Sequence, residues 1–87
     1  PTLSRKRGDH VQYQQSAVGE TIRRLRMEKN MSQELLSGLA GIARTHLSMI
    51  ETGRKQANFE TIWRLALALE LRPSELVAKI EQTCQNQ

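Results

Sequence analysis

Residues 44–51 carry hydrogen-bonding side chains at a spacing that would place them on one face of a helix. Arg44 and Ser48 are four positions apart and Thr45 lies three positions before Ser48, so all three would point outward together. An arginine can donate two parallel hydrogen bonds to O6 and N7 of guanine, and a hydroxyl can bond a base edge in the major groove of DNA. Met49 could add only apolar contact, such as with a thymine methyl. We predict base contacts by Arg44, Thr45, Ser48 and Met49, with a solvent-exposed polar helix as the alternative.

A second group of residues has the chemistry to bind a phosphate backbone. The helix expected at 33–40 starts after Ser32, a good N-cap, so the free N–H groups at its positive end would face an anion. Cations and an amide follow residue 51, in the loop before the next helix, where they would set register rather than read sequence. Ordinary loop charge is the alternative for Arg54 and Lys55. We predict phosphate contacts by Ser32, Gln33, His46, Arg54, Lys55 and Asn58.

These side chains need two short helices joined by a tight turn to hold them in place. Ser37 is small enough for the point where the helices at 33–40 and 44–51 cross, and Gly41 supplies the positive φ that the turn requires. The residues expected to face inward are Leu36, Ala40, Ile42, Leu47 and Ile50. The pattern is that of a helix-turn-helix, whose second helix enters the major groove of DNA.

Three further helices complete an all-α interpretation of the sequence. Residues 16–29 carry an apolar face, with Ser16 as the expected N-cap and Asn30 as the residue that ends the helix. A helix follows the cap Asn58, and its expected apolar stripe consists of Phe59, Ile62, Leu65, Ala66 and Leu69. The last helix starts at Pro73, a favoured first helical residue.

The length and charge of the chain set its organisation. With 87 residues it is long enough for one domain, which we expect at 16–83, after a flexible basic arm at 1–15 and before a frayed tail at 84–87. The formal net charge is +4, and residues 1–31 hold seven of the 13 Lys and Arg against three of the nine Asp and Glu. This asymmetry suits a polyanionic partner such as double-stranded DNA, although a solvated charged surface has the same composition.

From Val18 to Leu76, about two thirds of the chain, the sequence resembles one known family. The matching segments are IRRLRMEKNMSQELL, GIARTHLSMIETG, NFETIWRLALALEL and PSEL. They are similar to the Cro and phage-repressor type of helix-turn-helix domain, the xenobiotic-response-element family of regulators. The resemblance implies a five-helix, lambda-repressor-like domain that binds operator DNA as a dimer.

The resemblance also implies roles for individual residues. It implies that the Gln33 side chain binds phosphate and braces the second helix of the motif. It further implies that Arg26 and Glu51 form a structural ion pair rather than contact bases. Departures from the family pattern occur at Ala43, Met49, Thr52, Ala57 and Glu70. The lost cap at Ala43 weakens a helix start, and Met49 leaves the preferred DNA sequence open.

Several apolar residues fall outside the expected core. Leu35 and Leu39 would face outward, and we expect them to pack against the arm through Val11 or Tyr13. A homodimer is favoured because one recognition helix buries too little surface for operator-level affinity, and two would lie about 34 Å apart, one turn of DNA. The dimer interface is predicted near the fourth and fifth helices, at Trp63, Leu71, Val77 and Ile80.

The sequence gives little support for catalysis or metal binding. His10, His46 and Cys84 lack metal-ligand spacing, the only Asp is Asp9, and no glycine-rich phosphate loop occurs. We expect no enzyme activity, no metal and no cofactor. The sequence has no run of about 18 apolar residues, so no membrane span is expected. A lone cysteine fits a reducing cytoplasm, and we expect a cytoplasmic, nucleoid-associated protein.

Two kinds of regulator agree with these features. We expect no separate ligand-sensing domain, which favours a stand-alone phage-type repressor or a controller of a restriction–modification operon. The alternative is an antitoxin that binds a toxin and autoregulates its operon. In that case the outward leucines at 35 and 39, or the outward pair Trp63 and Leu67, would hold the toxin.

Overall fold

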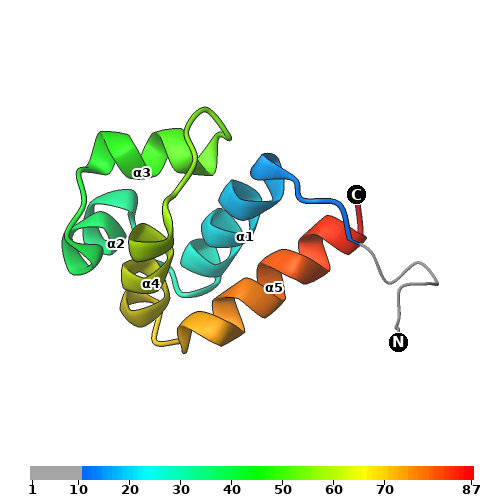
Figure 1. Ribbon diagram of the computed structural model, residues 1–87. Helices are drawn as coiled ribbons and strands as arrows, with labels where there is room; N and C mark the ends of the chain where they lie inside the picture. The colour runs from blue at the N-terminus through cyan, green and yellow to red at the C-terminus, as the bar shows by residue number, and fades with distance from the viewer. Residues whose placement is uncertain (1–10) are drawn as a thin grey trace.

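A computed structural model describes residues 11–87 as five α-helices joined by short loops (Figure 1). The helices are α1 (Gln15–Glu28), α2 (Gln33–Ala40), α3 (Arg44–Glu51), α4 (Phe59–Ala68) and α5 (Pro73–Gln85). The predicted all-α, five-helix fold is confirmed. Residues 1–10, which include most of the predicted arm, lie outside the described residues.

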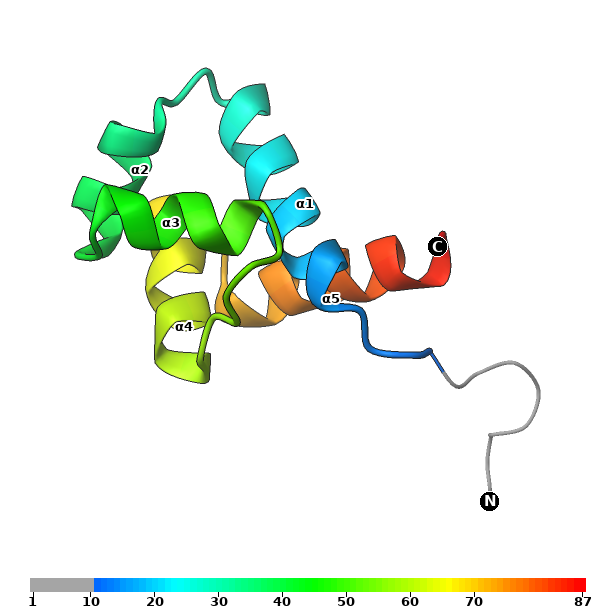
Figure 2. The same ribbon diagram turned by 90° about the horizontal axis from the view of Figure 1, so that it is seen from above.

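The five helices pack against one another in a ring. Helix α1 packs against α3 and α5, α2 packs against α3 and α4, and α4 packs against α5. In two perpendicular views α3 lies on the outside of the molecule and α5 lies on the opposite side (Figure 1 and Figure 2). One long side of α3 is therefore left free of the bundle.

Large aliphatic side chains from all five helices form one core. The fully buried ones are Ile22, Leu36, Leu47, Ile50, Leu65, Leu69 and Leu76. Burying a side chain of this size contributes about 1.5–3 kcal/mol relative to leaving it in water. Helices α2 and α3 have only eight residues each, which is too short for independent stability. Their position is thus fixed by packing against α1 and α4.

The first four helices end in the same way. Each is followed by a residue in the left-handed conformation: Asn30 (φ 56°), Gly41 (73°), Gly53 (79°) and Glu70 (63°). The next N–H then donates back to a carbonyl five residues earlier, as from Ile42 to Ser37 at 3.0 Å. This Schellman arrangement satisfies carbonyls that the helix leaves unpaired. The predicted helix ends at Asn30 and Gly41 are confirmed, while Glu70 adopts the conformation despite its β-carbon.

The prediction for the start of α1 was wrong by one residue. The helix begins at Gln15, and no side chain caps it, so Ser16 is not the N-cap. Instead, the Gln15 side-chain amide donates to the carbonyl of Gly53 at 2.7 Å. A tertiary contact with the loop after α3 fixes this end, in place of a local cap.

Helix α5 is longer than predicted. It begins at Pro73 as expected but continues to Gln85, so Cys84 and Gln85 are helical rather than part of a frayed tail. Two contacts hold the last turn on the bundle. The hydroxyls of Thr21 and Thr83 lie 2.7 Å apart in the buried interface with α1, and Cys84 packs against the core.

No helix within residues 11–87 combines the length and the apolar character needed to cross a membrane. Within the same range, no three His, Cys, Asp or Glu side chains gather closely enough to hold a metal ion.

Candidate nucleic-acid interface

The turn between α2 and α3 brings the two helices into close contact. Ser37, the small residue expected at the crossing, is 3% exposed, and its hydroxyl donates to the Glu34 carbonyl at 3.2 Å. Gly41 forms the turn with a φ of 73°, which side-chain-bearing residues rarely adopt. Leu47 and Ile50 are buried on the inner side of α3. The opposite side of α3 consequently faces outward.

This outward side carries the four residues predicted to contact bases. Arg44, Thr45 and Met49 are exposed, and Ser48 is half-buried. His46 lies half-buried in the same helix. The sequence-predicted base contacts therefore share one accessible helix surface.

Two of the predicted phosphate contacts are also helix caps. Ser32 Oγ accepts a hydrogen bond from the Leu35 N–H at 3.0 Å, and Asn58 Oδ1 accepts one from the Thr61 N–H at 2.8 Å. Capping uses an oxygen as acceptor, so the hydroxyl hydrogen of Ser32 and the amide hydrogens of Asn58 can still donate to an anion. Ala43 provides no side-chain cap for α3.

Two cations lie in the loop just after α3. The backbone N–H groups of Arg54 and Lys55 both donate to the Met49 carbonyl, at 2.9 and 3.2 Å, which folds the loop against the end of the helix. Both side chains are exposed, and neither forms an ion pair with any residue of the described range. Their charge is thus available to an external anion.

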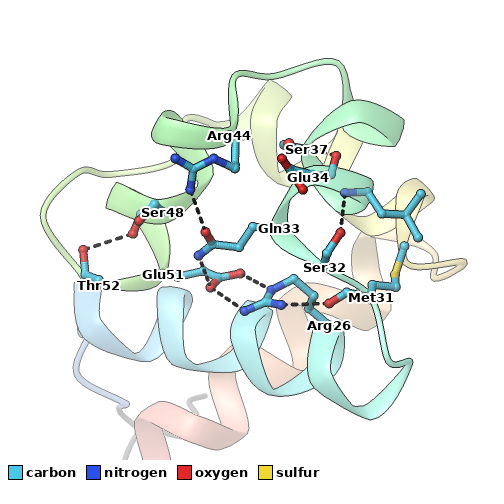
Figure 3. A network of polar contacts seen from close by, with 11 residues as sticks. Arg26, Met31, Ser32, Gln33, Glu34, Ser37, Arg44, Ser48, Glu51 and Thr52 are labelled. Carbon is cyan, nitrogen blue, oxygen red and sulfur yellow. Dashed lines mark hydrogen bonds and ion pairs between the residues drawn. The ribbon is translucent and has the colours of Figure 1, made fainter.

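A network of four polar side chains runs through the helix pair (Figure 3). Arg26 and Glu51 form an ion pair, with Arg26 Nε 2.7 Å from Glu51 Oε2 and their side chains 13% and 2% exposed. Glu51 Oε1 also accepts from Gln33 Nε2 at 2.9 Å, and Gln33 Oε1 accepts from Arg44 Nη1 at 3.3 Å. The last two bonds link the buried pair to the predicted base-reading residue. The residue pattern held no signal for them beyond the family-based expectation that Gln33 braces α3.

The apolar residues predicted for a dimer interface separate into buried and exposed ones. Ile80 is 8% exposed and belongs to the core, and Leu71 is half-buried against it, so neither offers much free surface. Trp63 and Val77 are 48% and 46% exposed.

Helix α4 presents more apolar surface than predicted. Phe59, assigned to the core from the sequence, is 69% exposed, so that prediction was wrong. As the first residue of α4 it lies at the edge of the apolar stripe, and its ring packs edge-on against Trp63 with centroids 5.9 Å apart. Phe59 also lines an open groove of about 660 Å³ with Val77 and Tyr13. We call the exposed residues Tyr13, Phe59, Trp63, Leu67 and Val77 the apolar strip.

The expectation that the arm covers Leu35 and Leu39 was wrong for the described part of the arm. These leucines are 50% and 60% exposed. Val11 and Tyr13 line the groove beside α4 and α5 instead.

Comparisons of sequence agree with this geometry. A helix-turn-helix family model matches residues 22–76. An uncharacterised HTH-type transcriptional regulator of Sinorhizobium fredii, y4dJ, is 36% identical over 66 residues, which cover 76% of this chain and 86% of the relative. The control protein C.BamHI of Bacillus amyloliquefaciens is 35% identical over 60 residues, 68% of this chain and 74% of that protein.

Solved structures show the same fold. The restriction-modification controller protein C.AhdI from Aeromonas hydrophila matches with a TM-score of 0.69 and 35% identity, over 71% of this chain and 94% of that chain. The clp gene regulator ClgR from Corynebacterium glutamicum matches in fold, with a TM-score of 0.75 and 21% identity, over 80% and 74%. The chain therefore belongs to the Cro/C1-type helix-turn-helix family and is a transcriptional regulator with a helix-turn-helix DNA-binding domain.

Proposed function

We propose that the protein binds a near-palindromic DNA operator as a homodimer, with α3 of each protomer in the major groove. The observation that carries the proposal is the outward face of α3. Side chains suited to base edges lie on it, with Gln33 at its N-terminal end and the exposed cations Arg54 and Lys55 at its C-terminal end. Phosphate-binding groups at both ends of a reading helix fix its register on the duplex.

Each side chain of this face has a distinct role in the proposal. Arg44 reads guanine, Thr45 and Ser48 bond base edges, and Met49, 40% exposed, contacts a thymine methyl. The remaining predicted contacts go to phosphates and hold both ends of the helix pair in register. They are made by Ser32, Gln33, His46, Arg54, Lys55 and Asn58.

The apolar strip is the proposed contact between protomers. It joins aromatic and aliphatic side chains of α4 and α5 with Tyr13, and aromatic residues are enriched at the centres of protein interfaces. A twofold axis there would present two copies of α3 to one side of a duplex, about 34 Å apart.

Among regulators of this fold we favour a controller of a restriction–modification operon. C.BamHI is described as a control protein and C.AhdI as a restriction-modification controller, and each is 35% identical to this chain. A phage-type repressor would use the same face of α3.

A toxin-binding role is the second candidate, and one observation favours it. Leu35 and Leu39 form an exposed apolar pair on α2, which residues 11–13 do not cover. Purification from the native host would distinguish the two candidates. An antitoxin should co-purify with a second small protein in a fixed ratio. A stand-alone regulator should purify without a partner protein and bind its operator at full occupancy.

Selection of bound sequences from a random duplex pool tests the proposed function. The expected product is a near-palindrome whose half-sites are centred one helical turn apart, because two α3 helices must reach the same side of the duplex. Enrichment of a single half-site with no symmetry would contradict the dimer, and no enrichment at all would contradict sequence-specific binding.

Two substitutions on the selected operator should have different signatures. Arg44→Ala should weaken binding by about 1–3 kcal/mol and relax selectivity at one base pair, because a bidentate contact to guanine is lost. Lys55→Ala should weaken operator and random DNA alike and lower the salt slope by about one, as expected for one phosphate contact. Fluorescence anisotropy at several salt concentrations measures both effects, with Lys79→Ala on α5 as the control. Equal losses on operator and random DNA would rule out base reading by Arg44.

A further inference from the structure

We propose that Glu51 is a positioning residue for DNA reading: it fixes the orientation of the Gln33 amide, and that amide holds the guanidinium of Arg44. The inference rests on the proposed function, because it requires Arg44 to contact a base. It gives the Arg26–Glu51 pair a second task besides joining α1 to α3. Figure 3 shows the four side chains as one continuous chain from the interior to the surface.

The buried carboxylate of Glu51 fixes the orientation of the Gln33 amide. Glu51 is 2% exposed at its side chain and accepts three hydrogen bonds, two from Arg26 and one from Gln33. A carboxylate only accepts hydrogen bonds, so the Gln33 group that faces it must be the NH₂. The flipped amide would place its oxygen against an oxygen of a carboxylate whose side chain is only 2% exposed. The Gln33 carbonyl oxygen must therefore point away from Glu51, towards Arg44.

The Gln33 carbonyl oxygen in turn restricts the guanidinium of Arg44. Arg44 is exposed, and a free arginine side chain samples many rotamers in water. Its Nη1 donates to Gln33 Oε1 at 3.3 Å, which favours one direction for the guanidinium. Arginine has five N–H donors, and a guanine needs two. The bond to Gln33 thus restricts Arg44 without using up its capacity to read a base.

The inner end of the network is held by several hydrogen bonds from Arg26. Arg26 is held twice, by Glu51 and by the Met31 carbonyl, which accepts from Arg26 Nη1 at 2.8 Å. Residues on α1, on the loop before α2 and at the end of α3 therefore share one anchor. The bonds from Gln33 to Glu51 and from Arg44 to Gln33 connect this anchor to the outward face of α3.

The test measures discrimination at the base pair read by Arg44, as the ratio of affinities for the operator and for the same duplex with that pair changed. Gln33→Met removes both the NH₂ that bonds Glu51 and the carbonyl oxygen that bonds Arg44, but keeps the size of the side chain. The double variant Arg26→Met/Glu51→Met replaces the buried pair by apolar groups, which proteins often tolerate, and frees the amide to flip. Each should lower the ratio about fivefold at that base pair and leave the ratios at other base pairs unchanged.

Two further variants complete the design. Leu76→Val, a core truncation on α5, which carries none of the four network residues, controls for lowered stability and should keep the wild-type ratio. If the double methionine variant is folded by circular dichroism and keeps wild-type discrimination, Glu51 does not position Arg44. If Arg44→Ala changes no single ratio, the base-reading role fails and the positioning role fails with it. The two failures are thus distinguishable.

Discussion

Replacing Arg26 with methionine should lower the free energy of unfolding by about 3–5 kcal/mol, because it leaves the carboxylate of Glu51 buried without its counter-ion. The Glu51 side chain is 2% exposed, so water cannot replace the guanidinium. Only the bond from Gln33 would remain on that carboxylate. Urea denaturation followed by circular dichroism measures the loss.

A matched control lies on the same helix. Arg24 and Glu28 also form an ion pair on α1, but at 3.9 Å and with side chains 45% and 62% exposed. Because exposed pairs contribute about 0–1 kcal/mol, Arg24→Met should change the stability very little. The double variant Arg26→Met/Glu51→Met should recover most of the loss, since no charge is then stranded. Similar effects for Arg24→Met and Arg26→Met would show that burial does not govern this pair.

Local signals explain why the helix-turn-helix was predictable from sequence. The caps Ser32 and Asn58 and the turn residues Asn30 and Gly41 act within a few residues of themselves, so their types alone indicate where helices start and stop. The bounds of α2 and α3 match the predicted ones. By contrast, α1 starts through a bond between Gln15 and Gly53, 38 residues apart, which no local pattern encodes.

The same distinction applies to the candidate site. Helical spacing placed Arg44, Thr45 and Ser48 on one face because that face depends only on the period of the helix. The bonds that Gln33 forms join residues 18 and 11 positions apart in the sequence, and they depend on how α2 crosses α3. The exposure of Phe59 likewise depends on which element packs beside the first turn of α4. The spacing of apolar residues within the helix does not predict that neighbour.

Gly19→Ala should lower the free energy of unfolding by about 3 kcal/mol, near the upper end of what overpacking costs. Helix α1 packs against α3. A β-carbon at Gly19 would lie 2.8 Å from the carbonyl oxygen of Glu51 and closer still to that of Ile50. Both neighbours are backbone, so the clash cannot be relieved by a side-chain rotamer and must move the end of α3.

Helix propensity alone would predict the opposite result, namely that Gly19→Ala stabilises the protein. Alanine is favoured over glycine inside a helix by about 1 kcal/mol. Gly38 on α2 is the control, because a β-carbon there meets nothing within 4 Å, so Gly38→Ala should stabilise the protein by roughly that amount. Thermal unfolding of the two variants should therefore shift the midpoint in opposite directions. A stabilised Gly19→Ala variant would mean that α1 and α3 are further apart than described, and the position of Glu51 would need revision with them.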